Sequence, residues 1–205
     1  MVRSKVWLVL STAFLTSSLV AATCESLTAL KPAGTTITAA HNVTAGALTA
    51  EEPQISVAPA DIKKVPAFCR VQGVIQPSAD SHIEFEIWLP ASGWNGRYEG
   101  LGNGGFAGGL DFFGLADAVT NGYAASATDT GHKGNQIDGR WAVGHPEKVT
   151  DFGYRAIHET AEKAKAVMAA FYGNGPQRSY FSSCSSLAPS DLIYSISWAT
   201  CSLLI

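Results

Sequence analysis

The sequence has no strong excess of charge of either sign. Its 14 Lys and Arg stand against 17 Asp and Glu, which gives a formal net charge of -3, and charged residues make up only 15% of the 205 residues. Binding to nucleic acid or to an anionic membrane surface usually requires a basic patch, so neither partner is expected. Hydrophobic residues make up 46% of the chain, which indicates a globular domain rather than a disordered segment.

The apolar N-terminal stretch is too short to span a membrane. Residues 6–20 are apolar apart from Ser and Thr, whereas a bilayer requires about 20 apolar residues. The stretch follows the basic residues Arg3 and Lys5 and ends in Val20-Ala21-Ala22, which fits the small-residue rule for signal peptidase. We interpret residues 1–22 as a secretory signal peptide and expect a secreted, extracellular protein without a membrane anchor.

Motifs for metals, disulfides and glycosylation are sparse. No two histidines have the spacing of a zinc-binding helix motif, so no metal site is expected. A single sequon, Asn42-Val43-Thr44, marks Asn42 as a surface glycosylation site. Secretion permits disulfides, and four cysteines allow three complete pairings. The cysteines are Cys24, Cys69, Cys184 and Cys201.

The secondary-structure signals predict an α/β sheet covered on both faces. Residues 23–68 are rich in Thr, Ala and Pro and lack periodicity, so we expect a loosely structured arm. From Cys69 onward, period-two alternation on both sides of a Pro/Asp turn predicts a β-hairpin, and strands then alternate with helices. The expected elements are strands at 71–75, 83–89, 97–101, 123–129 and 178–182, and helices at 112–121 and 151–172.

The helix at 151–172 has the clearest boundaries. Asp151 is a plausible N-cap, and Gly173 fits the left-handed position after a helix. One apolar stripe, expected to face the core, is formed by Ile157, Ala161, Ala164, Met168 and Phe171.

Ser185 is a candidate nucleophile by its place in the chain. It follows the strand at 178–182, and a nucleophilic serine is often held on a sharp turn after a strand. Its neighbours, Ser183-Cys184-Ser185-Ser186-Leu187, lack the glycines that usually flank such a turn. Gly102-Asn103-Gly104-Gly105 follows another strand, as an oxyanion-hole loop would. Spacing alone leaves open whether this segment is that loop or an ordinary Gly-rich turn.

Three histidines lie among acidic residues in the middle of the chain. His132, in Asp129-Thr130-Gly131-His132, fits a loop anchor better than a catalytic base. His158 lies beside the apolar stripe of the long helix and fits a surface or packing residue. His145 is a third possible base for a serine nucleophile.

Several stretches together resemble the tannase/feruloyl esterase family. They are PAFCRVQGVIQPSADSHIEFEIWLP (66–90), WNGRYEGLGNGGFAGG (94–109), GYAASATDTGH (122–132), DFGYRAIHETAEKAKA (151–166) and SYFSSCS (179–185). The resemblance implies an α/β-hydrolase catalytic domain with a large lid domain inserted downstream and a Ser-Asp-His triad. It implies hydrolysis of hydroxycinnamate or gallate esters, small aromatic esters or plant cell-wall phenolic esters, through a serine acyl-enzyme. It implies no cofactor for this chain, because any calcium ion of the family belongs to the lid.

Site residues follow from the resemblance position by position. Ser185 is implied as the nucleophile, and Cys184 as its disulfide-forming neighbour, whose partner is missing from this chain. The N–H groups of Gly104, Gly105 and Ser186 become candidates for the oxyanion hole. The resemblance also implies a structural Cys24–Cys69 bridge.

The sequence departs from the family at the nucleophile. The family pattern there is Gly-Cys-Ser-x-Gly-Gly-Arg, whereas Ser183 replaces the first glycine and Leu187 the next. We expect the resemblance to end at Ser186, so that residues 69–186 form a partial catalytic domain without the lid, the catalytic Asp and the catalytic His. Residues 187–205 are expected to be a divergent, disordered tail, as a frameshift, a retained intron or a truncated gene model would produce.

Two alternatives to an active esterase remain at this point. One is an inactive remnant or gene-model artefact of such an enzyme. The other is a secreted module that binds phenolic ligands with Trp88, Trp94 and the Gly-rich loop.

Overall fold

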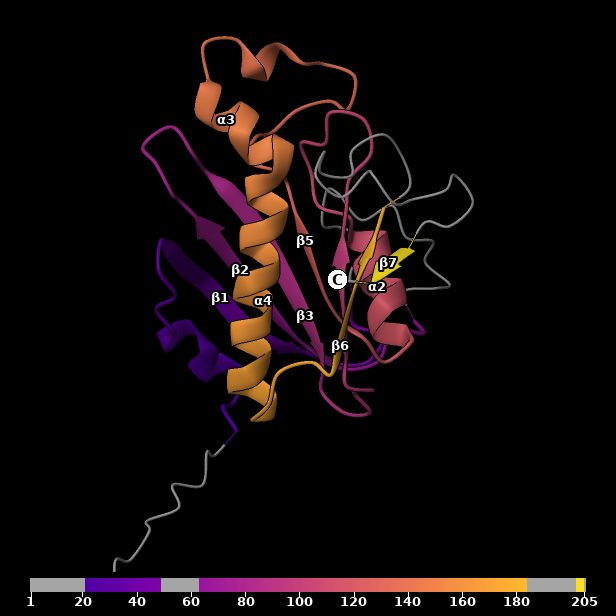
Figure 1. Ribbon diagram of the computed structural model, residues 1–205. Helices are drawn as coiled ribbons and strands as arrows, with labels where there is room; N and C mark the ends of the chain where they lie inside the picture. The colour runs from indigo at the N-terminus through magenta and orange to yellow at the C-terminus, as the bar shows by residue number, and fades with distance from the viewer. Residues whose placement is uncertain (1–20, 49–62, 184–201, 205) are drawn as a thin grey trace, which may run out of the picture.

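A seven-stranded sheet organises the protein (Figure 1). The computed structural model describes residues 21–48, 63–183 and 202–204, the last three by their backbone alone. The strands are β1 (Thr35–Val43), β2 (Phe68–Ile75), β3 (Ile83–Pro90), β4 (Arg97–Leu101), β5 (Ala124–Thr128), β6 (Arg178–Ser182) and β7 (Ser202–Leu204). The helices are the 3-10 helices η1 (Glu25–Ala29) and η2 (Arg140–Ala142), the α-helices α2 (Phe112–Thr120), α3 (Pro146–Thr150) and α4 (Ala156–Tyr172), and the π-helical turn η3 (Asp151–Arg155).

The sheet has an antiparallel half and a parallel half. Its strand order is β1-β2-β3-β5-β4-β6-β7. The pairs β1–β2, β2–β3 and β3–β5 are antiparallel, whereas β4 lies parallel to both β5 and β6. The predicted hairpin is confirmed, since Phe68 pairs with Pro90 and Ile75 with Ile83. The α/β architecture inferred from the sequence is likewise confirmed.

Helices α4 and α2 cover opposite faces of the sheet. Side chains of a strand alternate between its two faces, and neighbouring residues of β5 accordingly enter different cores. Ala124 packs with Ala164 and Met168 of α4, whereas Ala125 packs with Leu115 of α2. The prediction of a sheet covered on both faces is therefore confirmed.

The expected loose arm, residues 23–68, contains the first strand of the sheet, so that expectation is wrong. Strand β1 pairs along its whole length with β2, with a β-bulge at Thr38 because Ile37 faces Gly73 and Ala39 faces the next residue, Gln72. The bulge brings Ile37 and Ala40, three residues apart, to the buried side. Because of this bulge, the apolar residues of β1 do not alternate with a period of two, and so no strand signal is visible there in the sequence.

A disulfide fixes this N-terminal region to the sheet. Cys24, next to η1, is bonded to Cys69 of β2 with the Cα atoms 5.6 Å apart, and both residues are buried. The Cys24–Cys69 bridge implied by the family resemblance is confirmed. On the chain-entropy view, closing a loop with a sequence separation of 45 contributes about 4 kcal/mol to stability.

The long helix begins before the predicted start. Helix α3 starts at Pro146, whose fixed φ suits the first helical position, and the chain then continues through η3 into α4. Asp151 is thus not an N-cap; its buried carboxylate pairs with Arg155 at 2.5 Å. The predicted end is confirmed, since Gly173 follows Tyr172 with a φ of 78°.

The apolar stripe of α4 is only partly as predicted. Ala164 and Met168 are buried, but Ile157, Ala161 and Phe171 are half-buried. The buried residues of α4 are Ala156, Thr160, Ala164, Val167 and Met168.

Part of the expected disordered tail is a strand. Residues 202–204 form β7, which pairs antiparallel with β6 from Tyr180 to Ser182, so the expectation is wrong for these three residues. Most of the signal segment and the rest of the tail lie outside the described residues. No helix in the described part of the chain is both long and apolar enough to cross a bilayer.

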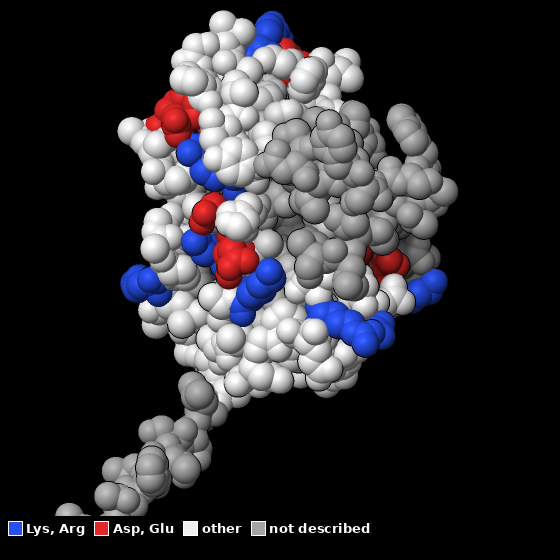
Figure 2. Space-filling view, viewed as in Figure 1, with Lys and Arg blue, Asp and Glu red and all other residues white. Residues whose placement is uncertain are grey.

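Acidic and basic side chains are interspersed on the face seen in Figure 2 and do not form a patch of one sign. Pairs one helical turn apart on α4 contribute to this pattern, namely Lys163 with Glu159 at 2.8 Å and Lys165 with Glu162 at 3.2 Å. Pairs of this spacing stabilise a helix by only a few tenths of a kcal/mol.

Candidate active site

Three loops meet where the parallel strands end. The carboxyl ends of parallel strands lie at the same edge of a sheet, which is where open α/β sheets bind their ligands. Strand β4 leads into the Gly-rich loop 102–105, β5 leads into residues 129–132, and β6 leads into Ser183. The sequence had singled out all three segments.

The Gly-rich loop lies directly beside the exit of β6. The N–H of Gly102 donates to the carbonyl of Ser182 at 2.8 Å. A Cβ atom on Gly102 would lie 2.5 Å from the side chain of Ser183 and 2.8 Å from the ring of Phe181. This position therefore needs glycine, because the Gly-rich loop and the end of β6 approach each other too closely for any side chain.

The next two glycines present backbone N–H groups at the edge. Neither the N–H of Gly104 nor that of Gly105 donates to an oxygen within residues 21–48 or 63–183. Gly105 has a φ of +55°, and a Cβ there would lie 2.3 Å from the carbonyl oxygen of Gln136. The loop conformation thus depends on glycine and on the segment that packs against it.

Asn103 ties the loop to β5. Its Nδ2 donates to the carbonyls of Gly109, at 2.9 Å, and Thr128, at 3.0 Å. No individual role was predicted for Asn103. A polar residue inside a run of glycines was the available signal, since such a residue can supply the contacts that glycines cannot.

Asp129 organises the turn after β5. Its Oδ1 accepts from the N–H groups of Glu84, at 3.0 Å, and Gly131, at 2.9 Å. Its Oδ2 lies 3.4 Å from Nζ of Lys133. Burial raises the pKa of Asp129 to about 6, against the lowering by the Gly131 N–H and Lys133. The sequence analysis noted Asp129 only as a neighbour of His132.

His132 is a buried loop anchor, as predicted. Its Nε2 lies 2.7 Å from the carbonyl oxygen of Phe106, directly after the Gly-rich loop. The imidazole stacks on Trp141, with ring centroids 3.8 Å apart, and meets Phe152 edge-on at 5.9 Å. Burial lowers the pKa of His132, opposed in part by the Phe106 carbonyl. A ring enclosed in this way is not free to act as a base on a neighbouring loop.

The other histidines lie away from the exit of β6. His145 Nδ1 is 2.8 Å from Asp80 Oδ1, an arrangement typical of an oriented base. Asp80, however, lies in the β2–β3 turn, and strands β5 and β4 separate β3 from β6. Three strand spacings amount to about 14 Å. His158 is exposed on α4, His41 is exposed on β1, and His82 lies in the same turn as Asp80.

The tryptophans proposed for a binding module are packing residues. Trp88 is fully buried and stacks on Phe68, with centroids 4.3 Å apart. Trp94 stacks on Tyr172 at 3.9 Å, and its Nε1 donates to the carbonyl of Arg97. Trp88 thus offers no face to a phenolic ring, and Trp94 is half-buried with one face on Tyr172, so the binding-module alternative loses much of its support.

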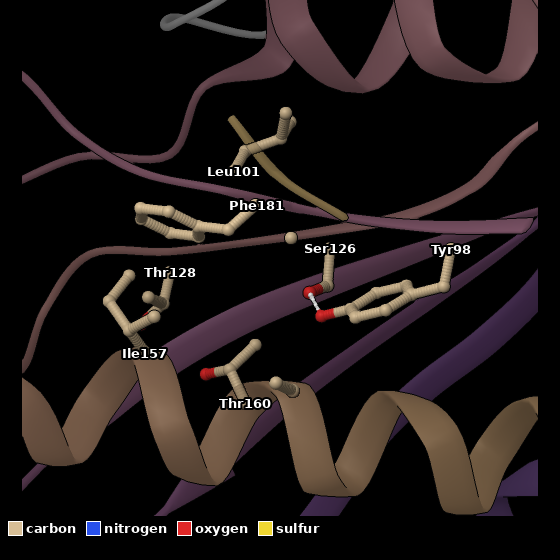
Figure 3. A pocket seen from close by; sticks show the side chains of 9 residues that line it. Tyr98, Leu101, Ser126, Thr128, Ile157, Thr160 and Phe181 are labelled. Atoms are coloured by element: carbon tan, nitrogen blue, oxygen red, sulfur yellow. Dashed lines mark hydrogen bonds between the residues drawn. The ribbon is translucent and has the colours of Figure 1, made fainter. Parts of the chain in front are cut away.

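A small cavity lies between the sheet and α4 (Figure 3). Its volume is about 10 Å³, which is enough for no more than one water molecule. Tyr98 and Ser126, which line it, share a hydrogen bond of 2.7 Å. The cavity is too small for an ester substrate, so the loops at the sheet edge remain the candidate site.

Ser185, Ser186 and Cys184 lie outside the described residues, and so the structure does not place them. Within the described ranges, no group of three or more His, Cys, Asp or Glu side chains is arranged to hold a metal ion.

Comparison with known proteins supports the family resemblance. The sequence profile described as tannase and feruloyl esterase matches residues 69–193. This chain belongs to the tannase and feruloyl esterase family. The match extends to residue 193, so the similarity continues past Ser186, where we expected it to end.

Individual family members agree in sequence and fold. An uncharacterized esterase of Xanthomonas campestris pv. campestris is 41% identical over 169 residues, which cover 82% of this chain and 28% of that protein. A protein named "probable feruloyl esterase B-2" from Neosartorya fischeri is 34% identical, over 75% of this chain and 27% of its own length. The crystal structure of feruloyl esterase B from Aspergillus oryzae superposes with a TM-score of 0.68 at 32% identity, over 78% of this chain and 31% of that one. The chain thus spans less than a third of these family members.

Proposed function

We propose that the protein is a secreted serine carboxylic ester hydrolase that cleaves hydroxycinnamate or gallate esters, with Ser185 as nucleophile. One observation carries the proposal: the glycine loop after β4 lies against the chain leaving β6, with Gly102 N and Ser182 O 2.8 Å apart. Ser185 follows Ser183 by two residues, and covalent geometry limits their Cα atoms to about 7 Å. A serine nucleophile and oxyanion donors have to be this close.

The proposed reaction proceeds through an acyl-enzyme. The Ser185 oxygen attacks the ester carbonyl while a histidine removes its proton, and the alcohol leaves with a proton from that histidine. Water then hydrolyses the acyl-serine. The N–H groups of Gly104, Gly105 and Ser186 are proposed to stabilise the negative oxygen of each tetrahedral intermediate. The described N–H groups of the two glycines suit this role because no backbone or side-chain oxygen in the described residues accepts from them.

The proposed histidine base is one outside these 205 residues, because no histidine of the sequence fits the role. All five histidines lie in the described part of the chain. His132 is enclosed, and His145 lies about three strand spacings away from β6. In the family pattern, a cysteine beside the catalytic histidine bonds the cysteine before the serine, and Cys184 occupies that position here.

Different observations support the proposed secretion and the proposed substrate class. The buried Cys24–Cys69 disulfide is typical of proteins from an oxidising compartment, and Asn42 is exposed on β1, as a glycosylated sequon residue must be. The preference for phenolic esters rests on family members whose names include feruloyl esterase.

Hydrolysis of methyl ferulate and methyl gallate by the protein, as its gene produces it, tests the proposal. Ser185→Ala should reduce kcat by about 10⁴-fold or more, because the nucleophile is lost while binding remains. Ser183→Ala, two residues earlier, is the matched control for folding near the turn. Turnover that survives Ser185→Ala would refute the assignment. The 205-residue segment alone should hydrolyse neither ester faster than its Ser185→Ala variant.

A further inference from the structure

The turn that follows the candidate oxyanion glycines is held from one side by a single short segment, residues 132–136. The turn closes through the N–H of Ala107, which donates to the carbonyl of Gly104 at 2.9 Å. Within it, the N–H of Phe106 donates to the carbonyl of Gln136 at 2.7 Å. The Phe106 carbonyl faces His132 Nε2, also at 2.7 Å. Both polar groups of Phe106 are thus bonded to the same segment.

The hydrogen bond from His132 defines one tautomer of its ring. A carbonyl oxygen can only accept, so Nε2 carries the hydrogen. Nδ1 is buried and has no hydrogen-bond partner among the described residues. Burial also lowers the pKa of His132, which favours a neutral ring with its hydrogen on Nε2. Anchoring a backbone carbonyl in this way needs a donor at the Nε2 position, and a ring with its hydrogen on Nδ1 could not provide it.

The surroundings of His132 keep the donor fixed in place. Trp141 and Phe152 enclose the ring, and Phe152 belongs to the π-helical turn η3. The preceding residue of that turn, Asp151, lies so close to Gly131 that a Cβ on Gly131 would be 2.7 Å from the Asp151 Cβ. Functional groups on rigid support hold their geometry better than groups on free loops.

We propose that His132 is a positioning residue of the active site, which aims the Gly104 and Gly105 N–H groups by holding the Phe106 carbonyl with its Nε2–H. This inference rests on the proposed esterase function and goes beyond it, because His132 touches neither substrate nor nucleophile. A displacement of oxyanion donors by a fraction of an ångström to 1 Å is enough to reduce a rate by about 10- to 100-fold.

Two amide variants separate the donor from the bulk of the side chain. In His132→Gln the side-chain NH₂ takes the place of Nε2 and can still reach the Phe106 carbonyl, whereas in His132→Asn it takes the place of Nδ1 and cannot. We expect kcat on methyl ferulate to fall about 10- to 100-fold in His132→Asn with KM changed less than about threefold. His132→Gln should recover most of this loss. Equal losses in both variants, or a change in KM alone, would overturn the proposal.

Backbone amide exchange provides a test that needs no activity. His132→Asn should speed exchange of the Phe106 and Ala107 amides by at least about tenfold, while His132→Gln should leave them close to wild type. Nitrogen-15 spectra of the wild-type imidazole should show the hydrogen on Nε2. If the wild type and Ser185→Ala hydrolyse esters equally, the proposed function fails, and these measurements still decide whether His132 holds the loop. Unchanged exchange in both variants would refute the positioning role.

Discussion

The two halves of the sheet treat their buried polar groups differently. In the antiparallel half, the buried Arg70 and Glu86 form a two-pronged ion pair, with Nε–Oε2 and NH2–Oε1 distances of 2.8 and 2.7 Å. Glu86 also accepts from Gln72 and Trp88. Among the described residues, every buried side-chain nitrogen or oxygen that lacks a hydrogen-bond partner belongs to a residue that follows β3 in the sequence. These atoms belong to Asn103, Asp129, His132, Trp141, Asp151, Thr160 and Ser183.

Asn103, Asp129, His132 and Ser183 lie in the segments that directly follow β4, β5 and β6. Unpartnered buried groups cost stability, so their presence in these segments calls for a reason. Backbone conformation follows the same division, since the non-glycine residues with positive φ among the described ones are Ala107 and Thr130. Both lie in the loops that follow β4 and β5. Strained and unsatisfied groups of this kind gather at functional sites. The antiparallel half therefore contributes mainly to the stability of the fold, whereas the carboxyl edge of the parallel half is where we propose that the ester hydrolysis takes place.

Removal of the disulfide should affect stability most and catalysis least. Cys24→Ser combined with Cys69→Ser should lower the free energy of unfolding by about 4 kcal/mol, because the unfolded chain regains the freedom of the closed loop. The kcat of the folded protein should stay within about twofold, since β3 and β5 lie between β2 and β4. Urea unfolding and ester hydrolysis measure the two effects.

Reduction of the wild type is the matched control for this pair of substitutions. A reductant should destabilise the wild type by at least a similar amount, and any effect of the reductant that remains in the double variant belongs to the disulfide proposed for Cys184. A large loss of kcat in the folded double variant would contradict the division between the two halves of the sheet.

Asp129, which links β3 to the loop after β5, should make stability depend on pH. Its folded-state pKa of about 6 lies above the ordinary 3.8. The folded protein therefore binds this proton more tightly than the unfolded chain. The stabilisation is complete below about pH 4 and is lost as the pH rises through 6, a change of about 3 kcal/mol. Asp129→Asn keeps an oxygen that can accept from the N–H groups of Glu84 and Gly131. Because the amide does not titrate, this substitution should remove the pH dependence of stability that Asp129 causes.

Urea unfolding of the wild type and Asp129→Asn between pH 4.5 and 7.5 checks the expectation. The stability of the wild type relative to the variant should decrease as the pH rises. Asp138→Asn is the control, because the Arg140 side chain holds the pKa of Asp138 at about 2, below this range. Parallel curves for the wild type and Asp129→Asn would show that the Asp129 carboxyl does not resist ionisation.

Sequence patterns predicted the elements whose signals are local. The strands at 97–101 and 178–182 have the predicted bounds, and the helix at 112–121 differs by one residue. Period-two alternation and a glycine after a helix act within a few residues, so they can be read without knowledge of the fold. The position of Ser185 after β6 was predicted in the same way, although the serine itself lies outside the described residues.

The features missed from the sequence depend on contacts between distant segments. Strand β1 was missed because its bulge breaks the alternation, and its pairing partner β2 lies after an intervening segment. Asp151 has the sequence signature of an N-cap but is buried against Gly131. His132 was predicted to be an anchor, yet its partner Phe106 lies 26 residues earlier, and only the folded chain reveals it.

Gly105→Ala tests the functional edge with a smaller expected effect on stability than the disulfide or Asp129 substitutions. Gly105 has a φ of +55°, and a Cβ would lie 2.3 Å from the Gln136 carbonyl oxygen. A side chain at positive φ costs about 1 kcal/mol, and relief of the clash has to move the turn, so we expect a total loss of about 2 kcal/mol. Because the moved turn carries the proposed oxyanion donors, kcat should fall about 100-fold.

Gly93→Ala separates backbone strain from displacement of the turn. Gly93 has a similar φ of +72° but no atom within 4 Å of the added Cβ, and it precedes β4 at the opposite edge of the sheet. Gly93→Ala should therefore lose only the strain of about 1 kcal/mol and keep the wild-type kcat. If Gly105→Ala also kept its kcat while losing more stability than Gly93→Ala, the turn would matter for folding alone. The oxyanion donors would then have to lie outside the Gly-rich loop.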